Sequence, residues 1–320
     1  MMVKNQLVQI SNSFGFARNW ICFLLLALSA CSVTAVKALS VPPETELKVQ
    51  LSAEEVTDGS LVFLNLALSP ELEQIVRADS AAVIRGKFQE TEFTFFSYND
   101  KNFLKYGAVL GVPYANKPGQ YPIEIKVVAS GGEYTREIPL RVVAGNWASE
   151  KLKVNSRHIR PTKKDMARIK RDKIEVGKIY NKLTQKKFWD GPFQFPVKSH
   201  VTSVFGTKRV FNGEFASFHT GLDFKAPNGT KVYAPSAGVV VLAKSLFFTG
   251  NTVMIDHGYG LVTLYAHLSK IKVKPDQTVK AGQLLGLSGM TGRVSGPHLH
   301  WQVIVNKTKV NPMGLIEILR

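Results

Sequence analysis

The sequence predicts an all-β protein in which two β domains flank a basic helical linker. Residues 39–147 hold short alternating runs between turn signals, and residues 148–194 are rich in Lys and Arg with helical periodicity. Residues 195–320 hold apolar runs separated by glycine-rich turns. At 320 residues the chain is long enough for two domains that each have a core.

Residues 1–38 have the layout of a secretory signal peptide. Lys4 and Arg18 precede an apolar run, 20–30, and small residues follow it. The run is about half of the roughly 20 residues that span a bilayer, which disfavours a permanent transmembrane helix.

The leader also contains both cysteines of the chain, Cys22 and Cys31. Leu28-Ser29-Ala30-Cys31 resembles a bacterial lipobox, in which Cys31 would be acylated and anchor the protein to the outer membrane. The other interpretation treats Cys31 as a small apolar residue of the leader, and the two are evenly balanced. In both cases we expect no disulfide in the mature chain.

The formal charge of +17 predicts attraction to polyanions such as nucleic acid, anionic lipid or an acidic wall polymer. Export and the lack of aromatic residues interleaved with the charges exclude nucleic acid as a partner. From Lys151 to Lys187 there are 14 Lys/Arg and three acidic residues. This charge is interpreted either as attachment to an anionic envelope surface or as a solvated linker face.

The N-terminal domain, 39–147, is expected to be an immunoglobulin-like β-sandwich without a disulfide. Ile123-Glu124-Ile125-Lys126-Val127 alternates as a half-buried strand does, turn signals recur, and no stretch looks helical. No residue cluster in it resembles an active site. In the linker, 148–194, Thr162 and Asp165 predict a helix N-cap. Apolar residues follow at three- to four-residue steps, namely Met166, Ile169, Val176, Tyr180 and Leu183.

The C-terminal domain, 195–320, is expected to be an antiparallel sheet with a groove. Its predicted strands are 239–242, 252–256, 261–266 and 300–305, and a hairpin loop at 257–260 joins two of them.

Four of the seven histidines of the chain gather in this domain with an aspartate. His298 and His300 are two apart, so a strand would project both into one groove. His219 and Asp223 are four apart, which would also place them on one strand face, and Gly221 between them leaves room for close approach. Three N/O ligands with an open position suit a catalytic zinc ion, and the remaining imidazoles suit proton transfer.

Longer segments around these residues closely resemble the lysostaphin-like (β-lytic, LytM-type) zinc metallopeptidases, which are peptidoglycan endopeptidases. The segments are Phe218-His219-Thr220-Gly221-Leu222-Asp223, Tyr265-Ala266-His267-Leu268-Ser269, Gly289-Met290-Thr291-Gly292 and Gly296-Pro297-His298-Leu299-His300. The resemblance covers about 195–311, and the upstream arrangement is similar to exported Gram-negative members.

The resemblance implies one zinc ion per chain, bound by His219, Asp223 and His300. It implies that His267 and His298 are catalytic, orienting or deprotonating water and stabilising the tetrahedral intermediate. It further implies hydrolysis of peptidoglycan cross-links in the periplasm or cell envelope of a Gram-negative bacterium. One departure is that residues 205–218 hold no tyrosine to contact the oxyanion.

A non-catalytic wall-binding activator of other murein hydrolases is the alternative, because the family contains degenerate members. Those members lack ligands or catalytic histidines, and this chain keeps all five. Nothing in the sequence separates glycine bridges from D-alanyl–diaminopimelate bonds as the substrate, and the Gram-negative arrangement favours the latter by analogy. Outside the site, His257 is expected to shape the hairpin turn and His158, in the basic linker, to be exposed. His200 is near the start of the domain and could line the groove, but the favoured interpretation is that it has no role in the site.

Overall fold

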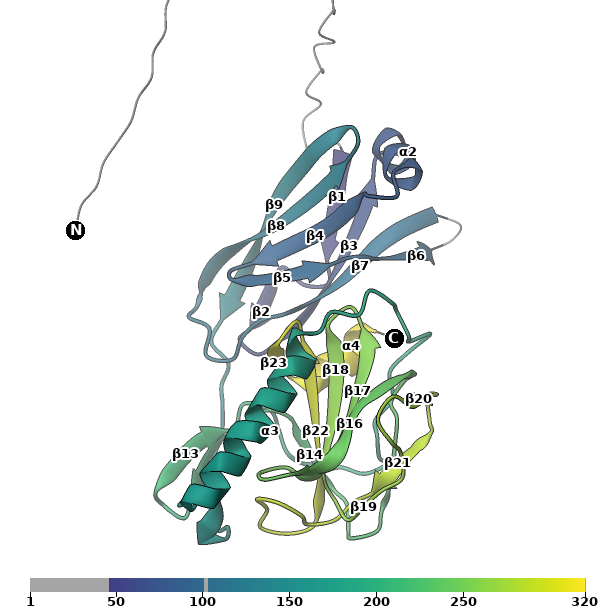
Figure 1. The fold of residues 1–320 in the computed structure, drawn as a ribbon. Helices are drawn as coiled ribbons and strands as arrows, with labels where there is room; N and C mark the ends of the chain where they lie inside the picture. The colour runs from purple at the N-terminus through teal and green to yellow at the C-terminus, as the bar shows by residue number, and fades with distance from the viewer. Residues whose placement is uncertain (1–45, 101–102, 320) are drawn as a thin grey trace, which may run out of the picture. The chain divides into compact units, whose positions relative to one another are not determined.

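The computed structural model describes residues 46–100 and 103–319 (Figure 1). The predicted signal peptide, its two cysteines and the lipobox lie outside the described residues. Within the described ranges, no helix has the length and apolar character needed to cross a membrane.

The N-terminal region contains two sheets. One has the order β1-β3-β7-β6, with β1 at Leu47–Leu51, β3 at Leu61–Leu68, β7 at Phe103–Gly111 and β6 at Phe96–Asp100. The other has the order β2-β9-β8-β4-β5, at Glu55–Thr57, Gly132–Val143, Gly119–Ala129, Val83–Phe88 and Thr91–Thr94. The two sheets share one apolar core, to which Leu64 and Leu110 contribute from one sheet and Ile123 and Ile125 from the other. The immunoglobulin type of this domain stays a prediction.

The expectation that this region has no helix is wrong. Helix α2 spans Pro70–Ala78 and buries Leu72. Its N-terminus is capped by Ser69, whose side chain accepts a hydrogen bond from the backbone of Leu72, and proline occupies the first turn. These are standard helix-start signals, so the sequence contained what was needed to predict α2.

The linker helix is confirmed as α3, Lys163–Asn181, with the predicted capping box between Thr162 and Asp165. A short 3-10 turn, η1 at Ser156–His158, precedes it. The predicted apolar stripe is only partly buried. Val176 and Tyr180 pack on the C-terminal sheet, whereas Met166 and Leu183 are exposed.

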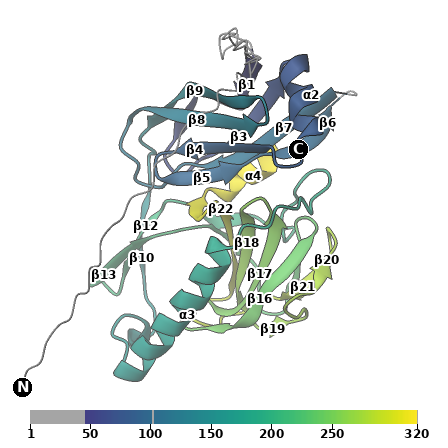
Figure 2. The same cartoon turned by 45° about the horizontal axis from the view of Figure 1, so that its top comes forward.

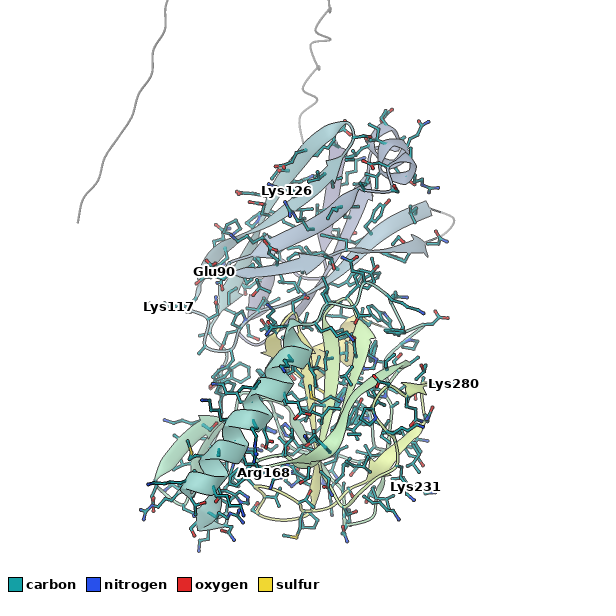
Figure 3. All side chains as sticks on the ribbon, in the orientation of Figure 1. Glu90, Lys117, Lys126, Arg168, Lys231 and Lys280 are labelled. Atoms are coloured by element: carbon teal, nitrogen blue, oxygen red, sulfur yellow. The ribbon has the colours of Figure 1, made fainter. Side chains whose placement is uncertain are left out.

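Helix α3 lies along the face of the C-terminal sheet in two views (Figure 1, Figure 2). Arg168, labelled in Figure 3, reaches the carbonyl oxygen of Ser245 at 3.2 Å, and Lys244 pairs with Glu175 at 2.9 Å. The helix exposes the remaining basic residues Lys163, Lys164, Lys170, Arg171, Lys173 and Lys178.

The C-terminal sheet is antiparallel, as predicted, with the order β11-β14-β22-β18-β17-β16-β20 and β23 beside β22. The strands in that order span Val201–Ser203, Leu222–Lys225, His298–Val305, Leu261–Leu268, Gly250–Gly258, Gly238–Leu246 and Thr278–Val279, with β23 at Thr308–Val310. All four predicted strands and the hairpin loop are present.

Smaller elements complete this region. One sheet joins β10, β12 and β13, at Ser149–Leu152, Lys208–Phe211 and Phe215–Phe218. Another joins β15, β21 and β19, at Lys231–Tyr233, Leu284–Leu287 and Lys270–Ile271. Helix α4, Pro312–Ile318, follows β23. The main core includes Leu61, Phe96 and Val109 from the N-terminal sheets, so residues 46–319 form one compact unit.

Strand β22 divides the C-terminal region into two environments. Leu299, Trp301 and Val303 are fully buried in the main core on one face of the sheet. The alternate residues His300 and Gln302 point to the other face, where α3 packs farther along the sheet. The catalytic candidates therefore sit on the opposite face of the same strand from the core.

Candidate active site

His219 and Asp223 do not share a strand face, contrary to the prediction. Strand β13 ends at Phe218, His219 follows it, and the chain turns through Thr220 and Gly221 before Asp223 enters β14. The turn brings the two side chains together, with 3.0 Å between His219 Nε2 and Asp223 Oδ1.

Gly221 leaves room at this turn, as predicted. A Cβ atom there would lie 2.3 Å from the carbonyl oxygen of Trp301 and 2.9 Å from Cε1 of His300. Only glycine therefore lets β14 begin this close to β22.

His298 and His300 lie two residues apart on β22 and point into one groove, as predicted. The pairing of β22 with β14 sets His300 opposite Asp223, and pairing with β18 sets it opposite Ala266. His300 Nδ1 lies 2.8 Å from Asp223 Oδ1 and 2.9 Å from His219 Nε2. His298 Nε2 is farther from the same Asp223 oxygen, at 3.7 Å.

The hydrogen-bond pattern of the trio fits a cation. His219 Nδ1 lies 2.8 Å from the carbonyl oxygen of Val204 and must donate to it, so a neutral His219 has a lone pair at Nε2. That lone pair faces the acceptor Oδ1 of Asp223 at 3.0 Å. A single proton on His300 Nδ1 cannot serve both neighbours. A metal ion between the three atoms removes this conflict, and three N/O donors are a common zinc ligand set.

The charges of the trio are consistent with metal binding. Burial opposes ionisation of Asp223, but its contacts with His219 and His300 outweigh burial and hold its pKa well below the ordinary value. Burial lowers the pKa of His300 to about 4. At neutral pH the site thus offers the carboxylate of Asp223 and the neutral imidazole of His300, the forms that bind metals.

His267 and His298 both present Nε2 to the groove. His267 Nδ1 donates to the carbonyl oxygen of Thr291 at 2.8 Å, and His298 Nδ1 donates to that of Gly296 at 2.9 Å. The two rings lie 4.8 Å apart between centroids. Each carbonyl fixes the tautomer in which Nε2 accepts a proton.

The backbone at His267 takes an uncommon conformation, with φ at 63°. A non-glycine residue in this region is strained, and its amide is held by the carbonyl oxygen of Thr249 at 2.8 Å. Burial first, and then the neighbouring imidazoles of His298 and His300, lower the pKa of His267 well below its ordinary value.

Sequence reasoning missed a polar network behind the trio. Arg209, on β12, donates to Oδ2 of Asp223, to Ser203 Oγ and to Oε1 of Glu150 on β10. Arg209 begins the segment Arg209-Val210-Phe211-Asn212-Gly213, which resembles the exported Gram-negative members, but its role was not predicted. Glu150 lies in no such segment and meets Arg209 where β10 pairs with β12.

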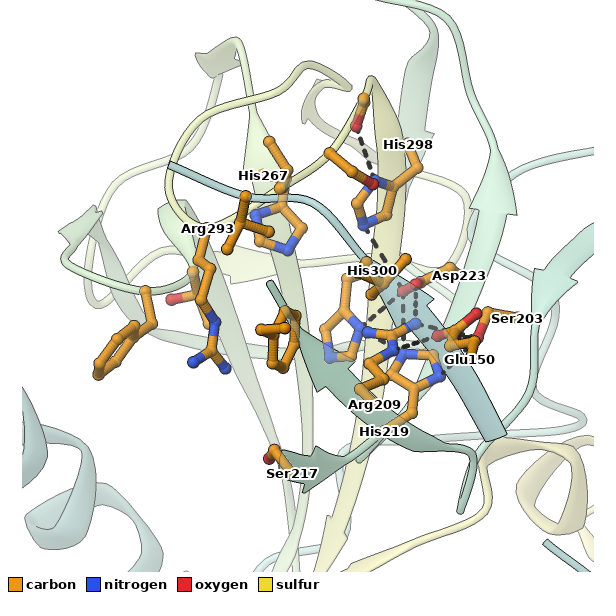
Figure 4. A pocket seen from close by; sticks show the side chains of 18 of the residues that line it. Glu150, Ser203, Arg209, Ser217, His219, Asp223, His267, Arg293, His298 and His300 are labelled. Carbon is orange, nitrogen blue, oxygen red and sulfur yellow. Dashed lines mark hydrogen bonds and ion pairs between the residues drawn. The ribbon is translucent and has the colours of Figure 1, made fainter. Parts of the chain in front are cut away.

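The site opens into a groove of about 360 Å³. Its lining includes the five predicted residues together with Arg209, Phe248 and Arg293 (Figure 4). Among the described residues that line it there is no tyrosine, in agreement with the departure noted in the sequence.

The other histidines lie elsewhere. His257 is buried at the end of β17 and bonds to the carbonyl oxygen of Ala237 at 2.7 Å and to Thr263 Oγ1 at 2.8 Å. His200 is exposed and outside the groove lining. The expectation that His158 is exposed is wrong, because its ring is half-buried 5.2 Å from that of Phe247.

The antiparallel sheet thus presents a His-Asp-His trio that could hold a metal ion beside two imidazoles whose tautomers are fixed. Residues 217–312 match the model of Peptidase family M23.

Two curated relatives come from Vibrio cholerae serotype O1. Over 123 residues the chain is 53% identical to "Peptidoglycan DD-endopeptidase ShyA", covering 38% of this chain and 29% of that protein. Over 288 residues it is 30% identical to "Peptidoglycan DD-endopeptidase ShyC", covering 84% and 63%. The chain thus spans less than two thirds of the length of either relative.

One solved structure is similar over most of the chain. It is described as a putative peptidase M23 from Pseudomonas aeruginosa, with a TM-score of 0.60 and 27% identity. The match covers 82% of this chain and 96% of that one. The similarity in fold therefore extends beyond residues 217–312.

Proposed function

We propose that the protein is a zinc-dependent endopeptidase that hydrolyses peptide cross-links of bacterial peptidoglycan. The observation that carries the proposal is the convergence of a metal-binding trio and two Nε2 acceptors on one groove. The intact set of five residues supports a hydrolase over a non-catalytic wall-binding activator.

His219, Asp223 and His300 would hold one zinc ion. When bound, zinc lowers the pKa of a water molecule and polarises the scissile carbonyl group. Asp223 supplies the negative charge of the ligand set, and Arg209 fixes its other oxygen.

His267 and His298 carry the proton transfers. Both keep Nδ1–H on a backbone carbonyl group, so Nε2 accepts the proton of the attacking water. The imidazolium then stabilises the negative charge that develops on the carbonyl oxygen and passes its proton to the leaving amine. The depressed pKa of His267 keeps its ring neutral, and therefore able to accept, at neutral pH.

The names of the relatives favour a bond between two D-centres, as in a D-alanyl–diaminopimelate cross-link. Such a substrate places the protein in the periplasm or cell envelope. The predicted signal peptide supports export, and an acylated Cys31 would add an outer-membrane anchor.

The test is incubation of the zinc-loaded chain with defined cross-linked muropeptides and mass spectrometry of the products. We expect cleavage at the cross-link by the wild type, and none with chelator or with His219→Ala. Absence of cleavage by a folded, zinc-loaded wild type would count against the proposal. A folded chain that binds no zinc would instead favour the non-catalytic activator.

A further inference from the structure

Arg293 lines the groove at the side of His267, whereas Arg209 lies at the side of Asp223 (Figure 4). Arg293 also lines an adjoining hollow that runs from the groove toward α3, where Lys309 and Lys173 are further lining residues. Arg209 and Arg293 thus line the groove itself, and Arg293, Lys309 and Lys173 line the hollow beside it.

The backbone of Arg293 is fixed relative to His267. Its amide donates to the carbonyl oxygen of Phe248 at 2.7 Å, and Gly292 before it has φ at 81° and lies close against Gly250. Thr291, two residues earlier, accepts the hydrogen bond of His267 Nδ1. One short segment therefore positions both an acid–base group and a guanidinium.

The guanidinium of Arg293 is held between aromatic rings. Its central carbon lies 4.5 Å from the ring centroid of Phe211 and 4.7 Å from that of Phe248. Aromatic faces position a cation without contributing a negative charge. Burial first, and then the nearby charge of Arg209, lower the pKa of Arg293, and a carboxylate in the groove would favour its charged form.

The substrate chemistry offers such a carboxylate. In a D-alanyl–diaminopimelate cross-link, the carbon that bears the scissile nitrogen also bears a free carboxylate. A glycine bridge has no charged group at that position. An arginine beside the site could therefore bind the carboxylate of a D-alanyl–diaminopimelate cross-link, whereas a glycine bridge offers it no charged group.

We propose that Arg293 binds the carboxylate next to the leaving amine and so selects D-alanyl–diaminopimelate cross-links. The inference rests on the proposed peptidase function and assigns a specificity residue within it.

The experiment compares two cross-linked dimers that differ in one group. One keeps the carboxylate on the leaving side, and in the other it is a carboxamide. For the wild type we expect kcat/KM to be about 10- to 100-fold higher for the carboxylate, in the range of a charge-assisted hydrogen-bonded pair. Arg293→Gln should lower kcat/KM for the carboxylate dimer to that for the carboxamide dimer. Arg293→Lys should prefer the carboxylate dimer less strongly than the wild type does. Arg171→Gln, an exposed arginine on α3, is the matched control and should behave as wild type.

Equal rates on both dimers in the wild type would overturn the role of Arg293 and leave the peptidase proposal standing. An undiminished preference in Arg293→Gln would do the same. Cleavage of neither dimer by the wild type would overturn the peptidase function itself. Circular dichroism and bound zinc verify each variant, and if Arg293→Gln does not fold, a preference in Arg293→Lys equal to wild type overturns the inference.

Discussion

Arg209 donates to Oδ2 of Asp223, while Oδ1 of the same carboxylate contacts His219 and His300. The two oxygens thus have separate partners, one set in the ligand trio and one behind it. Glu150 accepts a hydrogen bond from Nε of the same guanidinium. This arrangement fixes the rotation of the carboxylate before any ion binds.

Replacing Arg209 should weaken metal binding more than it changes folding. We expect Arg209→Met to reduce zinc affinity about 10- to 100-fold, the usual cost of losing a partner of a metal ligand. Competition with a chromophoric chelator measures this, and Arg171→Met serves as the control. Unchanged zinc affinity in Arg209→Met would show that Asp223 needs no such support.

The two groups of histidines should separate by experiment. His300→Ala should lose stoichiometric zinc because it removes a ligand. His267→Ala and His298→Ala should keep zinc and lose about 10²- to 10⁴-fold in kcat, the range expected for a general acid–base group. Zinc content and muropeptide turnover are measured on the same preparations. Loss of zinc in His298→Ala would show that His298 is a ligand.

Zinc should stabilise the folded chain, because three facing donor atoms lie within 2.8–3.0 Å of one another. At a free zinc concentration of 100 times Kd the gain in unfolding free energy is about 2.7 kcal/mol. Denaturant unfolding with zinc and with chelator measures it. His219→Ala should show no gain, and magnesium, which prefers oxygen ligands, should not replace zinc. A gain in His219→Ala equal to wild type would place the ion elsewhere.

His257 should make stability depend on pH. Burial lowers its pKa in the folded chain to about 4, against about 6.5 when unfolded. The unfolded chain therefore binds a proton first, so this contribution is complete above pH 6.5 and is lost as pH falls toward 4. The loss amounts to about 3 kcal/mol. Between pH 7 and pH 4.5 the free energy of unfolding should fall more in wild type than in His257→Gln. An equal fall in both would show that His257 does not make this contribution.

Gly221→Ala should disturb the junction of β14 and β22, because the new methyl group would meet the backbone of Trp301. We expect a loss of roughly 1–3 kcal/mol in unfolding free energy together with weaker zinc binding. Gly296→Ala is the matched control, since a Cβ there meets nothing within 4 Å. Equal stability of the two variants would mean that β14 and β22 can move apart enough to accommodate the methyl group at little cost.

The sequence predicted local features better than meetings between distant segments. The capping box of α3 and the His298–His300 pair depend on spacing within one element, and both are confirmed. The relation of His219 to Asp223 was wrong because spacing alone cannot distinguish a strand from a turn that brings the same two side chains together. Glu150 reaches the site through the pairing of β10 with β12, and Arg209 lies beside the site because β12 pairs with β13; no local pattern encodes these pairings.

Because strand β22 carries core residues on one face and site residues on the other, a change in its register would affect folding and catalysis together. A one-residue insertion near its start would turn the imidazoles inward and the indole of Trp301 outward in the same step. Such a variant would lose core packing and the active site together. Length changes in homologous chains should therefore accumulate outside this strand.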